Sequence, residues 1–527
     1  MNSKVLIIGN HPINADLTKQ YIQRGDDVVS LKSDQELDQT IIGSFKEFVL
    51  LADHDSNALD ADNKVMGTLQ QIATESPDPI NGRKPLCHLL LRSHSILHLI
   101  RLDGFCKEIE DKLEVNPFTM EDQWGQTIAM GLDREPITKQ TEKTVHLVIF
   151  GMSEVAEQVA INAAHVCHYP NYLQNGHTLR TRITVIDESA FDKSREWIER
   201  YKHLFDNCYY RLVDTKKRPA VVKTSKPKYK DREDFVDVEW EFVSSSSYDK
   251  LVRDKISQWS KSKFQLLTIV FAYDRTDNGL NDALHLPDTV ISAKISVYVY
   301  MQSDKAFSQI KHSDNFPHVI PFGMVDFGYD INIPIIKMAK NVNYVYDCCY
   351  QDNYESWNGH LRFSVEIDEK KKELLWSAKS CVKRMSNIYN AMTIGVKMRS
   401  MGFNKDDWDK FYDLSEEEIE MLAEVEHNRW NVEELILGFR PCNDDEFKEV
   451  ADSIEAYCQK RRDEGYDAVK NEQTLKEIYK EKIKAHYDLR AYSDLRPDKT
   501  GKSVKDYDRC LSACIPLIAK ESREGKV

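Results

Sequence analysis

The chain is 527 residues long, which is more than one hydrophobic core accommodates, so two to four domains are expected. Its hydrophobic fraction of 41% and charged fraction of 30% are typical of globular proteins, and no apolar run approaches the roughly 18 residues that cross a bilayer. The formal net charge of −14 argues against direct nucleic-acid binding, which requires a basic surface. The short apolar N-terminus does not have the pattern of a signal peptide, so we expect a cytoplasmic protein that is not inserted in a membrane.

Cysteine and histidine spacing gives no sign of a metal site. The 11 cysteines are scattered and include no CxxC pair, and the histidines show no HExxH spacing. In a chain without a signal peptide, this usage predicts reduced, mostly buried thiols. We therefore expect no structural metal.

The first predicted unit, residues 1–135, alternates between short apolar runs and helical patterns, which is typical of a parallel sheet covered on both faces. Its strands are expected at Val5–Ile8, Val28–Val29, Phe48–Leu51 and Leu86–Leu91. The turn after Gly9 is poorly suited to a dinucleotide, because His11 and Pro12 crowd it and Pro12 lacks a backbone donor. We predict a degenerate Rossmann-like domain that binds no dinucleotide, followed by a connector over residues 116–143.

A second unit is predicted over residues 140–400. Its first strand, Val145–Phe150, leads directly into a helix through Gly151-x-Ser153-x-x-Ala156. Gly151 permits a tight turn, Ser153 is small enough for a phosphate to approach the backbone, and the alanine permits close packing of helix on strand.

The acid of a dinucleotide site is predicted at Asp187, where the strand Ile183–Asp187 ends. A carboxylate at this position accepts hydrogen bonds from a ribose hydroxyl. Asp187 follows Gly151 by more than the usual spacing of about 20 residues. An insertion over Tyr169–Thr181 accounts for most of the excess.

Six strands in this order indicate a complete doubly wound sheet. The remaining four are expected at Val236–Val243, Leu266–Ala272, Ile295–Met301 and Val319–Phe322. The predicted cofactor is NAD or another adenine nucleotide, and the predicted binding residues are Gly151, Ser153, Glu154, Val155 and Asp187. A Rossmann domain with an empty, purely structural site is the alternative.

One basic segment interrupts this unit. Residues 216–232 carry eight lysines and arginines together with Pro219 and Pro227, and they show no apolar period. We predict an exposed, solvated loop; contact with an anionic partner is the less favoured interpretation.

The C-terminal third is predicted to be helical. Apolar residues recur at helical spacing between Leu374 and Ile394, and a linker is expected at Trp408–Tyr412. Ser415 followed by Glu418 predicts a capping box at the start of a helix that ends at Gly438. A long charged helical stretch and a final helix are expected at Asp445–Ile483 and Tyr507–Lys520.

The two Rossmann-like units, with Gly151-x-Ser153-x-x-Ala156 and Asp187, resemble nucleotide-binding domains of the TrkA-N or RCK type over residues 1–340. Domains of that type regulate potassium channels and transporters by binding NAD, other nucleotides or ions. The resemblance implies that the second unit binds a nucleotide and acts in regulation.

A second resemblance covers residues 414–520, within a predicted domain at 410–527. The motif residues are Leu422-Ala423-Glu424-Val425-Glu426-His427-Asn428-Arg429-Trp430, Gly438-Phe439, His486-Tyr487-Asp488-Leu489-Arg490-Ala491-Tyr492-Ser493-Asp494-Leu495 and Asp506-Tyr507-Asp508-Arg509. They are similar to the RyR repeat of ryanodine receptors. Phe439, Tyr487 and Ala491 depart from the usual tryptophan and prolines of that repeat.

If the segments of this motif pack together, they bring aromatic rings and hydrogen-bond donors to one place. Such a set suits stacking and hydrogen bonding of a base or a phosphate. The predicted ligand-binding residues are His427, Arg429, Trp430, His486, Arg490 and Tyr492. In the alternative interpretation, Trp430 and Tyr492 are core anchors and His427 is a buried histidine with satisfied hydrogen bonds.

Together these patterns predict a cytoplasmic sensor or regulator without turnover. It would bind a nucleotide in the second Rossmann-like unit and a small anionic ligand in the RyR-like domain, and it would form a homo-oligomer. The RyR resemblance implies a nucleotide signal, in the setting of phage defence. An NAD-linked or nucleotide-consuming enzyme and a regulatory subunit of a potassium transporter are the alternatives, although no catalytic acid–base pair is evident.

Overall fold

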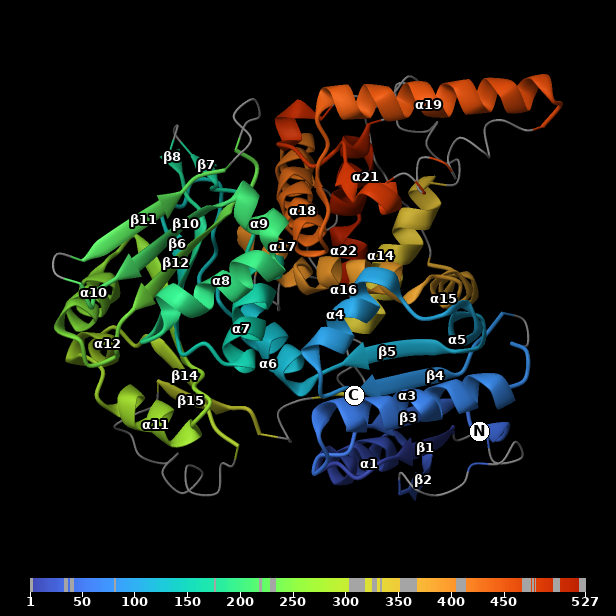
Figure 1. The fold of residues 1–527 in the computed structure, drawn as a ribbon, viewed down its shortest axis with the longest axis horizontal. Helices are drawn as coiled ribbons and strands as arrows, with labels where there is room; N and C mark the ends of the chain where they lie inside the picture. The colour runs from blue at the N-terminus through green and yellow to red at the C-terminus, as the bar shows by residue number, and fades with distance from the viewer. Residues whose placement is uncertain are drawn as a thin grey trace.

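The computed structural model describes residues 3–32, 37, 42–79, 82–174, 177–217, 220–227, 234–302, 318–324, 329–331, 334–350, 367–403, 414–466, 475, 478, 480–495 and 503–520. One parallel and one mostly parallel sheet, with flanking helices, are followed by a helical C-terminal region, which confirms the predicted α/β class (Figure 1). Within the described ranges, no helix has the length and apolar character needed to cross a membrane.

The N-terminal unit is a five-stranded parallel sheet in the order β2-β1-β3-β4-β5. Its strands are β1 (Lys4–Ile8), β2 (Asp27–Leu31), β3 (Glu47–Leu51), β4 (Leu86–Leu90) and β5 (Glu114–Phe118). This order is one of the two common doubly wound arrangements, with its topological switch point between β1 and β3. The four predicted strands are confirmed.

The connector predicted from residue 116 instead begins with β5 and continues into helix α6 (Met120–Ala129). Pro117 obscured this strand, because proline cannot donate to a central ladder. In the structure β5 is the edge strand, paired only with β4, so the missing N–H of Pro117 leaves the ladder intact. The other helices of this unit are α1 (Ile13–Arg24), α3 (Ala58–Glu75), α4 (His94–Asp103) and α5 (Lys107–Lys112).

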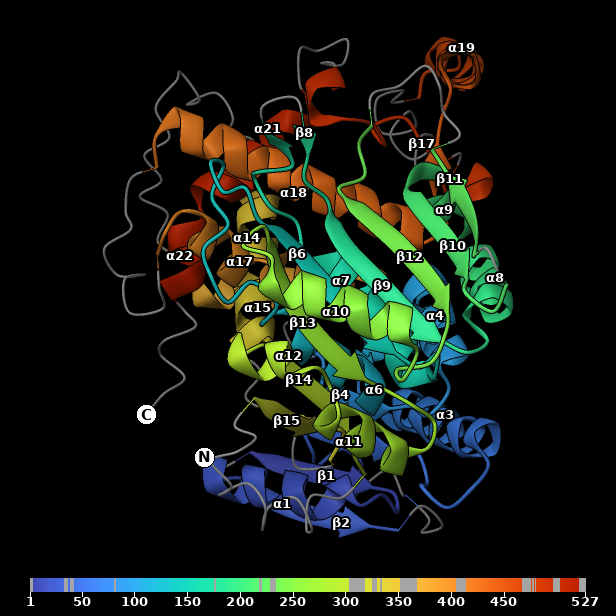
Figure 2. The ribbon, with the colours of Figure 1, turned by 90° about the vertical axis from the view of Figure 1, so that its left-hand side faces the viewer.

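The central unit is an eight-stranded sheet in the order β11-β10-β12-β9-β6-β13-β14-β15, seen face-on in Figure 2. Its strands are β6 (Thr144–Phe150), β9 (Thr181–Asp187), β10 (Tyr209–Asp214), β11 (Val221–Ser225), β12 (Val238–Ser244), β13 (Gln265–Phe271), β14 (Ser296–Tyr300) and β15 (Val319–Phe322). Without the hairpin β10–β11, the order is 3-2-1-4-5-6, which is that of a dinucleotide-binding Rossmann fold. The six predicted strands are confirmed, and the unit is Rossmann-like.

The predicted basic loop is wrong in part, because residues 221–225 form the edge strand β11, antiparallel to β10. Val222 and Thr224, residue types that favour strands, flank Lys223 there, and a lysine-bearing edge resists pairing with other chains. Lys216 and Lys217 lie in the turn before β11. The basic residues at 218, 228, 230 and 232 lie outside the described residues.

Helix α7 (Glu154–Val166) is the central helix of the molecule and is buried along almost its whole length. Its alanines permit close packing on the sheet, and Gly125 permits close approach of α6, since a Cβ there would lie 2.7 Å from the carbonyl oxygen of Gln158. The other helices of the unit are α8 (Ala190–Arg200), α9 (Lys202–Asn207), α10 (Lys250–Lys261), α11 (Thr276–Leu284) and α12 (Asp288–Ser292).

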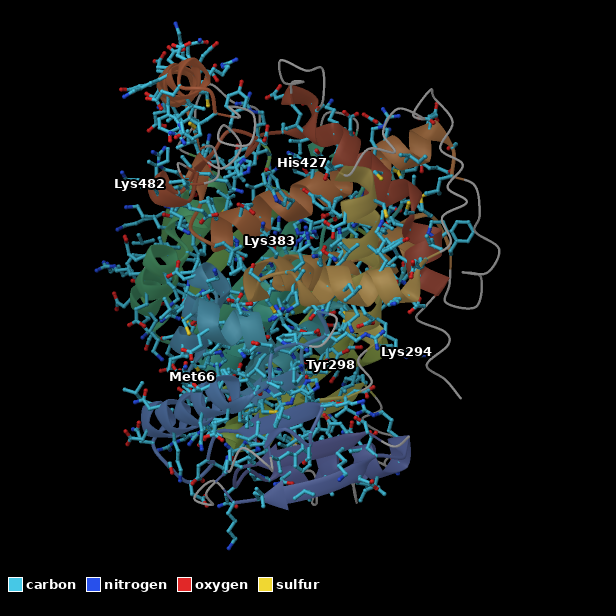
Figure 3. The ribbon with its side chains drawn as sticks, turned by 90° about the vertical axis from the view of Figure 1, so that its right-hand side faces the viewer. Met66, Lys294, Tyr298, Lys383, His427 and Lys482 are labelled. Carbon is cyan, nitrogen blue, oxygen red and sulfur yellow. The ribbon has the colours of Figure 1, made fainter. Side chains whose placement is uncertain are left out.

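After the central sheet the chain returns to the N-terminal unit through α14 (Pro334–Tyr350), α15 (Glu369–Ser377), α16 (Cys381–Met392) and α17 (Ile394–Ser400). Trp376 Nε1 donates to Glu114 Oε1 at 2.8 Å, and Arg384 donates to the carbonyl oxygen of Val115 at 2.9 Å. In Figure 3, Lys383 on α16 lies between Met66 of the N-terminal unit and His427 of the C-terminal region. The sequence grouped these helices with the central unit at 140–400, whereas their contacts also cover the N-terminal sheet.

The C-terminal region begins with the long helix α18 (Glu416–Ile436), and the predicted capping box of Ser415 and Glu418 is present. The remaining elements are β16 (Arg440–Pro441), α19 (Asp444–Asp463), β17 (Ala485–His486), η4 (Tyr492–Asp494), α21 (Val504–Ala513) and α22 (Ile515–Lys520). Helix α19 extends away from the other helices at the top of Figure 1. The linker predicted at Trp408–Tyr412 lies outside the described residues.

Most cysteines are the reduced, buried thiols that the sequence predicts. Among the described residues, nine cysteines are free, and seven of these are buried. Cys510 is disulfide-bonded, so the expectation of reduced thiols is wrong at that position.

Candidate functional site

Gly151 directly follows β6. The topological switch point of the central sheet lies between β6 and its neighbour β13, because the connections after these two strands run in opposite directions. Gly151 has a φ of +105°, and its N–H donates to the carbonyl oxygen of Ile186 at 2.9 Å. A Cβ at this position would lie 2.5 Å from the carbonyl oxygen of Ala272. Both the backbone conformation and the close contact therefore require glycine here.

The side chain of Ser153 points into the protein and caps α7. Its hydroxyl accepts from the N–H of Ala156 at 3.1 Å and donates to the carbonyl oxygen of Ala272 at 2.7 Å. Val155 is buried in the core, and the Glu154 side chain is 75% exposed. A ligand at this turn would therefore meet backbone groups and the carboxylate of Glu154.

The N-terminus of α7 is suited to a phosphate. The first-turn N–H groups of a helix have no intrahelical acceptor, and the helix dipole places partial positive charge there. Asp187 ends the neighbouring strand β9 and is half-buried, with Oδ1 accepting from the N–H of Ser189 at 2.8 Å. A carboxylate has further acceptor sites, so Asp187 could also bind a ribose hydroxyl.

A hydrogen-bonded group absent from the sequence prediction lies at the same edge of the sheet. Tyr273, two residues after β13, donates to Asp282 Oδ2 at 2.9 Å, and Ser247 donates to the same oxygen at 2.6 Å. Burial, together with Asp282, raises the pKa of Tyr273 above its usual range, so this phenol stays protonated. Ser247 follows β12 whereas its partner Asp282 lies on α11, so no local sequence pattern relates the two residues.

The carboxyl edge of the N-terminal sheet also contributes polar residues. His11, His54, Arg92 and His94 follow the ends of β1, β3 and β4, and the His11 and His54 rings are 5.3 Å apart. Burial lowers the pKa of His11 to about 4, with His54 and Arg92 adding to the shift. This histidine is therefore uncharged at neutral pH.

The N-terminal and central units meet at His94 on α4, through helices α6 and α7. Its Nε2 lies 3.5 Å from Glu121 Oε2 on α6 and 3.9 Å from Glu154 Oε2 on α7. Burial alone would lower the pKa of His94, but Glu121 and Glu154 raise it, which favours the charged ring. Sequence reasoning missed this group because its members come from separate strands and have no shared spacing.

The C-terminal segments named from the motif do pack together. His427 Nε2 lies 3.1 Å from the carbonyl oxygen of Arg490, and its Nδ1 lies 3.2 Å from Asp508 Oδ2. Ring centroids are separated by 5.9 Å between His427 and Tyr492, and by 5.4 Å between His427 and Trp430. The Trp430 and His486 rings meet edge-on at 4.8 Å. These four residues form what we term the aromatic cluster.

Arg490 is 5% exposed and lies beside this cluster. Its Nε donates to the carbonyl oxygen of Tyr487 at 2.9 Å, and its guanidinium lies 4.0 Å from the centre of the Tyr487 ring. The terminal nitrogen Nη2 has no hydrogen-bond acceptor in the described part of the chain and is 3.9 Å from Asp444 Oδ1. This guanidinium thus retains donor capacity.

Arg429 does not join the aromatic cluster. It is 2% exposed on another face of α18, where it donates to Glu426 at 2.8 Å and to Glu433 at 2.5 Å. Lys397 on α17 also donates to Glu426, at 2.6 Å. Burial would raise the pKa of Glu426, but Arg429 and Lys397 lower it to about 2. Arg429 is therefore committed to a buried ionic network.

Comparisons with known proteins add little to this geometry. No protein-family model matches the chain, and no curated protein matches it. Among solved structures, a dipicolinate synthase subunit from Bacillus halodurans is similar at a TM-score of 0.20 and 10% identity, covering 61% of this chain and 88% of that one. That likeness is too weak to support a function, so the strand order and the glycine turn remain the basis for the site.

Proposed function

We propose that this protein is a regulatory protein that binds an adenine nucleotide, with NAD as one candidate, at the carboxyl edge of its central sheet. The observation that carries the proposal is the obligate glycine turn at Gly151, which leads into α7 at the switch point of a 3-2-1-4-5-6 sheet. Open α/β sheets bind ligands at this point, because adjacent loops diverge there and leave a crevice.

The roles follow from the local geometry. The backbone of residues 151–155 and the N-terminus of α7 would hold phosphate groups. Asp187 would accept from a ribose, and Tyr273 and Ser247 would border the same edge. Glu154 would repel a phosphate unless His94, 3.9 Å away, offsets its charge.

The regulatory part of the proposal rests on the two resemblances. A TrkA-N or RCK-type unit followed by a RyR-type domain would couple nucleotide binding to a second, anionic ligand in the aromatic cluster. A cytoplasmic homo-oligomer that senses a nucleotide signal in phage defence, or that regulates a potassium transporter, fits this arrangement. The remaining donor capacity of Arg490 supports the second ligand.

An NAD-linked enzyme is the second candidate. The observation that favours it is the pair His94–Glu121, which faces the glycine turn from the other sheet and could transfer protons. Incubation of the purified protein with NAD, followed by chromatography of the nucleotide, distinguishes the two functions. Consumption of NAD would favour the enzyme, and intact NAD would favour the regulator.

Calorimetry with NAD, AMP and ATP tests nucleotide binding. Gly151→Val should abolish binding, because its Cβ would meet the Ala272 carbonyl. Asp187→Ala should weaken binding about tenfold, since charge-assisted hydrogen bonds contribute roughly 1.5–3 kcal/mol.

Gly25→Val is the matched control. It places valine at a similar φ, +93°, where no atom lies within 4 Å of the new Cβ. Nucleotide affinity should be unchanged in this variant. Undiminished affinity in both Gly151→Val and Asp187→Ala would reject the site.

A further inference from the structure

A pocket lined by both polar and apolar side chains lies where the N-terminal unit, the central unit and the helical regions meet. It has a volume of about 140 Å³ and is lined by residues of α4, α7, α8 with the residue after it, α16 and α18 and its C-cap. Figure 1 shows these helices converging at the centre of the molecule. We call it the junction pocket; its lining includes His94, whose Nε2 lies 3.9 Å from Glu154 Oε2 beside the glycine turn, but no residue of the aromatic cluster.

Two arginines line the junction pocket from different units. Arg101 on α4 donates to Asp122 at 2.6 Å, and its Nε has no acceptor among the described residues. Arg200 on α8 is 44% exposed at the mouth and donates to Glu157 Oε2 at 2.6 Å. Glu157 also accepts from the Tyr201 hydroxyl at 2.9 Å, so the Glu157 carboxylate is hydrogen-bonded to both Arg200 and Tyr201.

The inner wall holds a buried histidine with an unused nitrogen. His165 is 2% exposed and stacks on Tyr389 with 4.0 Å between ring centroids. Its Nδ1 has no hydrogen-bond partner in the described part of the protein. A buried polar atom left in this state costs roughly 1–3 kcal/mol, which a bound ligand would recover.

The lining offers hydrogen-bond donors to an anion. Arg101 is paired with Asp122 and Arg200 with Glu157, but the Nε of Arg101 and the Nδ1 of His165 have no hydrogen-bond partner among the described residues. Burial lowers the pKa of both His98 and His165, and nearby Arg101 adds to each shift. Both rings are therefore neutral and able to donate one hydrogen bond each.

We propose that the junction pocket binds a small oxyanion, such as phosphate or a short carboxylate, held by Arg101, Arg200 and His165. The volume of the pocket limits the size of the ligand, because a cavity of roughly 150 Å³ accommodates a molecule as large as benzene and no nucleotide. The oxyanion would accept from groups on α4, α7 and α8. It would therefore link the N-terminal and central units and stabilise their relative position.

Thermal unfolding of the full chain with phosphate, compared with chloride at equal ionic strength, is the test. A ligand that binds only the folded protein raises the melting temperature by mass action. Phosphate should raise the melting temperature of the wild type, and calorimetry should give one site per chain. Acetate in a parallel series shows whether the natural ligand class is phosphate or carboxylate.

Two variants locate the effect. Arg200→Gln removes a half-exposed charge and should lower phosphate affinity about tenfold, which corresponds to about 1.4 kcal/mol. His165→Phe keeps the ring that stacks on Tyr389 and should also lose the response to phosphate. Arg195→Gln, an exposed change on the same helix α8, should behave as the wild type.

Phosphate could also bind at the glycine turn, and Gly151→Val separates the two sites. That variant should lose nucleotide binding and retain the phosphate response. A phosphate response that is lost in Gly151→Val but intact in Arg200→Gln and His165→Phe would overturn the junction pocket. Absence of any response in the wild type would overturn it as well.

Discussion

Glu433 and Glu434 are neighbours on α18 but differ in how their carboxylates are paired. Glu433 is 1% exposed and accepts from Arg429 at 2.5 Å. Glu434 faces the ammonium group of Lys480, whose Nζ lies 3.8 Å from Oε2, and that oxygen has no hydrogen-bond donor in the described chain. Burial raises the pKa of Glu434 from 4.5 to about 7, and Lys480 offsets only part of this shift.

This shift predicts a pH-dependent stability. The folded protein holds a proton on Glu434 that the unfolded chain releases, so the free energy of unfolding falls as pH rises from 4.5 to about 7. Glu434→Gln should remove this loss and stabilise the protein by on the order of 1–3 kcal/mol at pH 7.5, with little effect at pH 4. Urea unfolding across this pH range measures the change.

Glu449→Gln, an exposed change on α19, serves as the control for that series. It should leave the pH dependence as it is in the wild type. Equal pH slopes in Glu434→Gln and the wild type would show that Glu434 is ionised in the folded protein.

At the scale of elements, α18 and the segment 485–495 are joined through the main chain of Arg490. His427 and Asn431 both approach its carbonyl oxygen, at 3.1 and 2.9 Å. The side chain of Arg490 is not part of these bonds. The two elements therefore stay together whichever side chain is present at 490, whereas Trp430 packs directly between the His427 and His486 rings.

This difference predicts contrasting effects of two substitutions. Trp430→Ala should destabilise the C-terminal region by about 2–4 kcal/mol, because a large packed ring is removed. Arg490→Ala should reduce the melting temperature by less than half as much, yet weaken binding of an anionic probe such as AMP about tenfold. Thermal unfolding and calorimetry on the same preparations provide both readings.

The contrast decides between a binding site and a packing cluster. If Arg490→Ala unfolds the region as severely as Trp430→Ala, the aromatic cluster is structural and has no ligand. His427 has both ring nitrogens near partners, which suits either outcome, so it is not a useful test residue.

At the scale of the whole molecule, the N-terminal sheet depends on helices more than two hundred residues later. Trp376 is 0% exposed and donates to Glu114 at the start of β5, and Arg384 donates to the next residue of that strand. These contacts cover the edge strand β5, which would otherwise be open. We therefore expect the first unit and residues 369–403 to unfold together.

Trp376→Ala should consequently destabilise a sheet that is distant in sequence. We expect a loss of about 3–5 kcal/mol, since the residue is fully buried and hydrogen-bonded. Hydrogen exchange should become faster in β4 and β5 as well as in α15 and α16.

Trp259→Ala is the comparison for this experiment. Trp259 packs on His146 in the central unit, with 4.6 Å between ring centroids. Its replacement should accelerate exchange in the central sheet and leave β4 and β5 unchanged. If Trp376→Ala altered only its own helix, the dependence of the N-terminal sheet on this region would be disproved.

The sequence by itself determined the features that arise from short stretches of chain. Strands buried on both faces are continuously apolar, so central strands such as β1 and β6 were predictable from the runs Val5–Ile8 and Val145–Phe150. The turn at Gly151 requires a positive φ, and the capping box at Ser415 is a local hydrogen-bond pattern. Each of these depends on residues a few positions apart.

Only the tertiary structure decided how distant segments meet. Pro117 is tolerated because β5 is an edge strand, and Arg429 is separated from Arg490 because α18 turns it toward Glu426 and Glu433. The junction pocket draws its residues from five helices spread between positions 94 and 437. Spacing along the chain contains no information on such contacts, since they are set by packing between elements whose separation in sequence is arbitrary.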